Sequence, residues 1–232
     1  MNATKIAPIA KTIAFAVLAG AAAFGLAAPA NAASELMYGD PVAAGKYWHE
    51  QQYDDCVLMS SADVIGQITG ESPSEEAIIE KAHATPSVVH AGPIYTKPAD
   101  PDNPGPGGGA NTEDVPALLA RYRVAAVVID RGGPAAGGIR PGMAGLKQAL
   151  GDGHKVIVSV NAELIWHEPV EAKDKSGNPE SDHAVVVTGV DAAHGIVHLN
   201  DSGIAEGRDE QVPLELFVRA WATSDELMVV TL

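Results

Sequence analysis

Apolar residues recur at helical spacing over the segment Cys56–Thr69, where Leu58, Ala62 and Ile65 form one stripe. Gly70 follows the last periodic position and is expected to end this helix. A second helix is expected to open at a capping box with proline at its first position, the sequence Ser-Pro-Ser-Glu at 72–75, and to run to about residue 82.

The second half of the chain begins with a βαβ-like pattern and continues mostly as strands. Thr112 is expected to cap a short helix that runs to Tyr122, and a polar loop is expected over 161–182. The other predicted elements are a strand at 124–129, a helix at 141–150, a strand at 155–160, a hairpin of strands 183–190 and 196–200, a helix at 213–221 and a closing strand at 226–232. Helices come first and sheet later, which indicates an α+β fold.

Residues 97–110 contain four prolines and four glycines and almost no apolar side chains. This composition predicts a long exposed loop within the domain.

The amino terminus has the pattern of a cleavable signal peptide. Lys5 and Lys11 precede an apolar segment over 12–28, and Ala30-Asn31-Ala32 is a signal-peptidase site. The alternative is a membrane anchor, but this segment is slightly short for a spanning helix. We therefore expect a secreted protein, possessing one domain over 33–232 and no stable membrane insertion after cleavage.

Charge narrows the range of partners. The signal segment holds two of the 15 basic residues and none of the 30 acidic ones, so the mature chain has 13 basic residues and a net charge of −17. Nucleic acid and anionic lipid both require basic surface, so neither is an expected partner.

Cys56 is the single cysteine, and it falls in the first turn of the first predicted helix. Free backbone N–H groups and the helix dipole there favour a thiolate, so the position suits a nucleophile. Asp54 and Asp55 oppose the thiolate electrostatically unless they serve as caps. A buried inert thiol is the alternative interpretation.

A cysteine nucleophile needs a base and a group that orients the base. His183 opens an apolar strand, and a five-residue hairpin loop would pair Val190 with Ile196. His183 and Asp201 would then be diagonal neighbours on one face, and His198 would point to the other face. A loop of even length would reverse these assignments.

Oxyanion donors could come from the Cys56 N–H and from Gln51 or Gln52, which lie five and four residues earlier. Zinc-site spacings and phosphate-binding glycine loops do not occur in the sequence, so no cofactor and no metal are expected.

Trp48-x-x-Gln51 followed by Asp54-Asp55-Cys56 resembles the nucleophile region of papain-fold cysteine peptidases. The segments 183–191 and 197–203 resemble the bacteriocin-processing (double-glycine leader) peptidase family and its stand-alone secreted relatives. The resemblance implies a papain-like fold, with a helical part packed on an antiparallel sheet, and a Cys-His-Asp triad of Cys56, His183 and Asp201.

Two positions differ from the family pattern. Val57 replaces the usual glycine after the nucleophile, and Glu50 stands where the oxyanion glutamine is common. The resemblance therefore implies Gln51, with the Cys56 N–H, as the oxyanion donors, and Gln52 is the alternative to Gln51. The resemblance implies a secreted cysteine peptidase acting on a peptide or protein. Cell-wall peptide hydrolysis, acyl transfer with the same triad, and an inactive papain-fold binding module remain alternatives.

Overall fold

The computed structural model describes residues 36–99 and 109–232. The predicted signal peptide and the central part of the predicted 97–110 loop lie outside the described residues. None of the helices in the described segments has the length and apolar character needed to cross a membrane.

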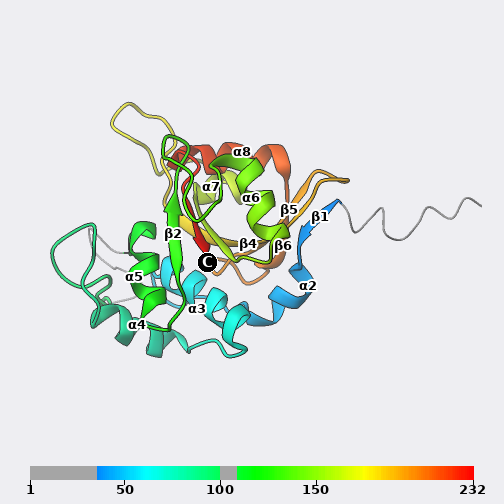
Figure 1. Ribbon diagram of the computed structural model, residues 1–232. Helices are drawn as coiled ribbons and strands as arrows, with labels where there is room; N and C mark the ends of the chain where they lie inside the picture. Colours follow the sequence, from blue (N-terminus) through cyan, green and yellow to red (C-terminus); the bar gives the residue numbers. More distant parts are fainter. Residues whose placement is uncertain (1–35, 100–108) are drawn as a thin grey trace, which may run out of the picture.

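A seven-stranded sheet forms the centre of the molecule, with strand order β2-β7-β3-β4-β5-β6 and with β1 paired to β4 beside this path (Figure 1). Every strand pair is antiparallel. The strands are β1 (Met37–Gly39), β2 (Ala126–Ile129), β3 (Val156–Val160), β4 (His183–Asp191), β5 (Ile196–Asn200), β6 (Arg208–Pro213) and β7 (Met228–Thr231).

The βαβ-like pattern predicted for the start of the second half does not give two adjacent parallel strands. Strands β2 and β3 run parallel, but the carboxyl-terminal strand β7 lies between them and pairs with both in the antiparallel sense. The local pattern could not reveal this insertion, because the inserted strand comes from the far end of the chain.

Helices cover both faces of the sheet. The helices are α2 (Pro41–Ala44), α3 (Cys56–Thr69), α4 (Glu75–His83), α5 (Val115–Ala120), α6 (Gly142–Gly151), α7 (Ala162–Ile165) and α8 (Leu214–Trp221), with 3₁₀ turns η1 (Gly45–Tyr47), η2 (Thr112–Asp114) and η3 (Ala222–Ser224). Helices α3, α4 and α5 pack on one face, and α6 and α8 on the other (Figure 1).

Alternation along β4 separates the two cores. Ala184 and Val186 join the core under α3, α4 and α5, whereas Val185 and Val187 join the core under α6 and α8. Strand side chains point alternately to opposite faces, so a strand buried on both sides is apolar throughout. This explains the continuous apolar sequence of β4.

Helix α3 has the bounds that the sequence predicts. Gly70 ends it in the left-handed conformation, with φ of 91°, and its N–H donates to the Gly66 carbonyl. The predicted start of α4 is wrong by two residues, because Ser74 is the cap and its hydroxyl accepts from the Ala77 N–H. The motif contains two serines that could cap a helix, and the structure uses the second of them, Ser74.

The β4–β5 hairpin differs from the expected register at its turn. Asp191, and not Val190, pairs with Ile196, so the connecting loop has an even length. A β-bulge between Val187 and Gly189 then adds one residue to β4, and Val186 pairs with Asn200 beyond it. Past the bulge the pairing is the expected one, and His183 and Asp201 share a face.

Candidate active site

His183 and Asp201 meet where β4 begins and β5 has just ended. The imidazole Nε2 lies 2.7 Å from Asp201 Oδ1, and the two side chains are 6% and 1% exposed. Pairing of β4 with β5 therefore brings together two residues that are 18 positions apart in the sequence. Nε2 is occupied by this contact, which leaves Nδ1 for a second partner.

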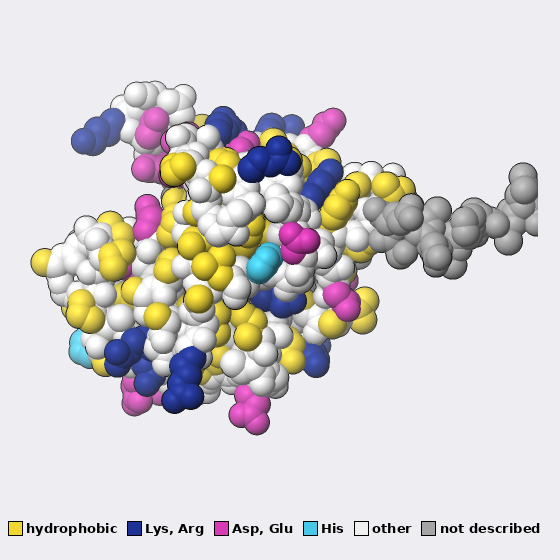
Figure 2. All heavy atoms as spheres, in the orientation of Figure 1, with side chains coloured by type: hydrophobic (Ala, Val, Ile, Leu, Met, Phe, Trp, Pro, Cys, Tyr) yellow, Lys and Arg dark blue, Asp and Glu magenta, His cyan; other side chains and the backbone are white. Residues whose placement is uncertain are grey.

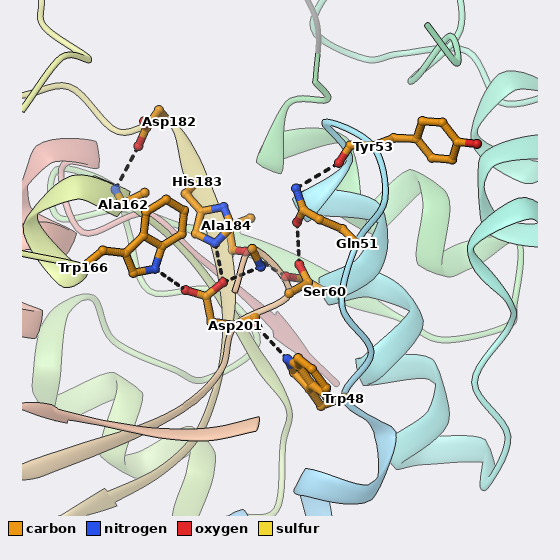
Figure 3. Close-up of polar contacts among 12 residues, drawn as sticks. Trp48, Gln51, Tyr53, Ser60, Ala162, Trp166, Asp182, His183, Ala184 and Asp201 are labelled. Atoms are coloured by element: carbon orange, nitrogen blue, oxygen red, sulfur yellow. Dashed lines mark hydrogen bonds and ion pairs between the residues drawn. The ribbon is translucent and has the colours of Figure 1, made fainter. Parts of the chain in front are cut away.

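The Asp201 carboxylate is held by donors on both oxygens (Figure 3). Oδ1 also accepts from the Gly203 N–H at 2.7 Å, and Oδ2 accepts from the Trp166 indole N–H at 2.9 Å. Burial raises the pKa of Asp201, but the hydrogen bond and charge of His183, together with these donors, lower it below its usual value. Asp201 is thus an ionised acceptor that fixes the imidazole.

Trp166 is a site residue that the sequence analysis missed. It follows α7 in the predicted polar loop, and its ring lies 5.3 Å from the His183 ring at 59°. In Figure 3 the indole and the imidazole approach the same carboxylate from two sides. A lone tryptophan in a polar loop was the available signal, since an indole is rarely left without apolar contact or a partner for its N–H.

Cys56 begins α3 and lines the same cleft as His183. Burial lowers the pKa of the His183 imidazole, but the charge of Cys56, together with the hydrogen bond and charge of Asp201, outweighs burial and raises the pKa well above its usual value. Negative charge beside the ring favours the protonated imidazole, which explains this direction.

Two side-chain hydrogen bonds fix α3 relative to the strands that carry the histidine and the aspartate. Ser60 Oγ donates to the Ala184 carbonyl at 3.0 Å, and Asn200 Nδ2 donates to Asp63 Oδ2 at 2.7 Å. Burial raises the pKa of Asp63 to about 6, against the hydrogen bonds from Gln67 and Asn200, which lower it. Each bonded strand residue is the direct sequence neighbour of His183 or Asp201.

The two candidate glutamines have different surroundings. Gln51 Oε1 accepts from the Ser202 hydroxyl at 2.8 Å, and its Nε2 donates to the Tyr53 carbonyl at 3.0 Å, so the amide is fixed beside the residue that follows Asp201. Gln52 is exposed, and its N–H donates to Glu75 Oε1. Of the two, Gln51 has the preorganised amide.

His198 lies on the opposite face of the sheet from His183. Its Nδ1 is 2.7 Å from Asp209 Oδ1, and its carbonyl accepts from the Thr188 hydroxyl. His198 and Asp209 therefore form a second histidine–aspartate pair with the same contact distance, and neither residue lines the cleft that contains Cys56. This pair is a natural control for the first.

A cleft of about 780 Å³ opens over Cys56 and His183. The helical wall contributes Asp54, Val57 and the segment 109–113, and the sheet wall contributes Ser159, the segment 180–182 and the turn before β7. A cleft of this size accommodates a peptide segment. Among the described residues, no group of three or more His, Cys, Asp or Glu side chains could hold a metal ion.

Comparison with other proteins finds similar sequences in mycobacteria. It is 62% identical over 231 residues to the uncharacterized proteins Rv1268c of Mycobacterium tuberculosis and Mb1299c of Mycobacterium bovis, and the match covers 100% of each chain. The chain belongs to the family of these mycobacterial proteins. No family model matches it.

The fold of the chain is papain-like. A crystal structure of a protein described as a C39-like peptidase, from Bacillus anthracis, superimposes with a TM-score of 0.53 at 18% identity, covering 81% of this chain and 95% of that chain. The expected papain-like α+β fold, with helices packed on an antiparallel sheet, is confirmed.

Asp55, directly before Cys56, is a buried acid. It is fully buried, and neither carboxyl oxygen has a hydrogen-bond partner among the described residues. Burial, followed by the charges of Glu75 and Asp54, raises the pKa of Asp55 to about 8. Although Asp55 is the N-cap of α3, its side chain makes no capping bond. The proton, and not capping, removes the negative charge that the sequence placed beside Cys56.

Asp55→Asn should stabilise the protein increasingly as the pH rises from about 4 to about 8. The folded-state pKa of Asp55 lies above the unfolded value of 3.8, so the stability linked to its proton is complete below that value and is lost as the pH rises through about 8. Asparagine is neutral at every pH, so it does not carry the cost of burying a charge at this position. Urea unfolding at pH 8 should show a gain of about 1–3 kcal/mol.

Asp54→Asn is the matched control, because Asp54 is the exposed neighbour. Its effect on the free energy of unfolding should be within about 0.5 kcal/mol at either pH. A gain for Asp55→Asn that is equal at pH 4 and pH 8 would show that Asp55 is ionised in the folded protein.

Proposed function

We propose that this protein is a secreted cysteine peptidase that hydrolyses peptide bonds through Cys56, His183 and Asp201. The observation that carries the proposal is a cleft lined by both Cys56, at a helix start, and His183, whose imidazole Nε2 is bound to a buried carboxylate. A thiolate–imidazolium pair oriented by a third group is the arrangement that activates a cysteine nucleophile. Secretion is supported by the signal pattern of residues 1–32.

In the proposed reaction the Cys56 thiolate attacks the carbonyl carbon of a peptide bond in the cleft. The imidazolium of His183 then gives its Nδ1 proton to the leaving amine, and the acyl group stays on the sulfur. The neutral imidazole next removes a proton from water, which attacks the thioester and releases the acid. Asp201 holds Nε2–H throughout and stabilises the imidazolium.

The negative oxygen of each tetrahedral intermediate requires donors that are already in place. The N–H of Cys56 is one candidate, because first-turn N–H groups of a helix have no intrahelical acceptor. The Gln51 amide is the other, since one of its two Nε2 hydrogens is bound to Tyr53 and the second is available.

Digestion of a peptide library by the secreted chain tests the proposal. We expect cleavage products that are absent when Cys56→Ala protein is used at the same concentration. Mass spectrometry of trapped reactions should also find an acyl group on Cys56. If the two proteins give the same products, or if no peptide of the library is cut, the peptidase assignment is wrong.

Gln51→Ala should lower kcat by about 100-fold, the usual cost of removing one oxyanion donor. KM should change little, because the donor acts on the intermediate and not on the bound peptide. Gln52→Ala is the matched control and should retain kcat within about twofold, because Gln52 is exposed. Equal losses in the two variants would remove Gln51 from the oxyanion site.

A further inference from the structure

Acidic side chains are concentrated in the cleft above Cys56. Asp and Glu make up five of its seventeen lining residues, compared with 30 of 232 in the whole chain, so the cleft is acidic beyond the protein's general character. No Lys or Arg occurs among the described lining residues. The five acids are Asp54, Glu113, Glu180, Asp182 and Asp225.

The acids belong to both walls and flank both members of the Cys56–His183 pair. Asp54 precedes the cysteine by two residues on the helical side, and Asp182 precedes the histidine directly on the sheet side. Figure 2 shows acidic side chains, in magenta, around the notch at the left of the molecule, between the loop of residues 166–180 and the helical part.

These carboxylates have few internal partners. Within the described part of the chain, the side chains of Asp54, Glu113, Glu180 and Asp225 form no ion pair, and Arg131, the cation near Asp225, is paired with Glu226. Asp182 accepts one hydrogen bond, from the Ala162 N–H at 2.9 Å. The negative charge of the cleft is therefore available to a ligand.

The spacing of the acids distinguishes between cationic ligands. A divalent metal ion requires several oxygen atoms that converge on one point, and no such group exists among the described residues. A single amine would need one carboxylate. Acids spread over both walls of a cleft of about 780 Å³ match an extended ligand that carries several separate positive charges.

We propose that the cleft selects polypeptide segments with Lys or Arg on both sides of the bond that is cut. This inference rests on the proposed peptidase function and specifies its substrate class. Charges of one sign in a cleft with low-dielectric walls focus the field and concentrate ligands of the opposite sign. The attraction acts over about a Debye length, about 8 Å at physiological salt, so flanking positions of the peptide feel it.

The experiment uses one peptide sequence, built on the bond cut best in the library digest, with Lys, Gln or Glu at the positions on each side. The Lys peptide should be cut with a kcat/KM at least about tenfold above that of the Glu peptide, with Gln between. Raising the salt from about 20 mM to about 500 mM should reduce this ratio several-fold. Cys56→Ala protein should bind the labelled peptides in the same order, measured by fluorescence anisotropy.

Substitutions of acidic residues test whether the preference for Lys over Glu arises in the cleft. Glu113→Gln combined with Asp225→Asn should reduce the Lys-to-Glu ratio by at least about threefold, because two cleft charges are removed. The control combines Glu80→Gln and Asp152→Asn, two exposed acids outside the cleft lining, and should leave the ratio unchanged. The control keeps the change in net charge the same.

The outcomes separate the inference from the function on which it rests. Cys56-dependent cleavage with equal rates for the three peptides, or a ratio reduced equally by both double variants, overturns the charge preference and leaves the peptidase function standing. Activity confined to peptidoglycan stem peptides also overturns the inference. Absence of cleavage together with absence of Lys-selective binding overturns both.

Discussion

Cys56→Ala should abolish peptide cleavage, with a loss in kcat/KM of about 10⁴-fold or more, because the attacking atom is removed and no other cysteine exists in the chain. The fold should persist, since the change removes one buried sulfur from the start of α3. We expect a loss of about 1 kcal/mol or less in the free energy of unfolding. Peptide turnover and urea unfolding measure the two effects on one preparation.

Removing the sulfur should also change the histidine beside it. The charge of Cys56 is the foremost of the effects that raise the pKa of His183, so the His183 imidazole should titrate at lower pH in Cys56→Ala protein. NMR titration of the imidazole signals can follow this change, with His198 as an internal control. An unchanged His183 titration would mean that the thiol does not interact electrostatically with the ring. Peptide cleavage retained in Cys56→Ala protein would show that Cys56 is not the nucleophile.

His183→Gln should reduce kcat/KM by about 10³-fold or more. Glutamine can still donate a hydrogen bond to Asp201, which limits the cost of leaving a buried carboxylate without its partner, but it cannot exchange a proton near neutral pH. The combined variant Cys56→Ala/His183→Gln should be no worse than Cys56→Ala alone, because residues that act as a unit are strongly non-additive.

His198→Gln is the matched control for this substitution. His198 is similarly buried and makes the same 2.7 Å contact with an aspartate, but on the other face of the sheet. Its activity should stay within about threefold of the wild type, with any change arising from packing. If His198→Gln is inactive and His183→Gln retains activity, the histidine is misassigned.

Local signals in the sequence were sufficient to predict the two elements that carry Cys56 and His183. The apolar stripe and Gly70 define α3 with its observed bounds, and the apolar segment from His183 defines β4. Strand β6, by contrast, was missed, because Arg208–Pro213 is mostly polar and is held as a strand by pairing with β5. Edge strands of this kind depend on tertiary context.

The contact between His183 and Asp201 was predicted from a hairpin that is wrong in detail. An even loop alone would have moved Asp201 to the other face, and the bulge near Thr188 restores the register. A bulge depends on the packing of both strands, and one strand's sequence does not reveal it. The predicted contact between His183 and Asp201 therefore depends on a β-bulge that the sequence analysis did not foresee.

Properties that depend on burial were also beyond the sequence. The sequence treats Gln51 and Gln52 as equals, whereas the fold attaches one to Ser202 and leaves the other exposed. It likewise treats Asp54 and Asp55 as two charges, whereas burial and Glu75 raise the pKa of Asp55. Both distinctions arise from residues that are distant in the chain.

The central claim is that His183 activates Cys56 as a nucleophile, and the rate of alkylation by iodoacetamide at neutral pH tests it most directly. Cys56 is 6% exposed and lines the cleft, which is the route by which the reagent would reach the sulfur in the folded protein. We predict that Cys56 reacts at least about tenfold faster in the wild type than in His183→Gln, with His198→Gln equal to the wild type. Equal rates in wild type and His183→Gln, or labelling that begins only when the protein unfolds, would contradict the account.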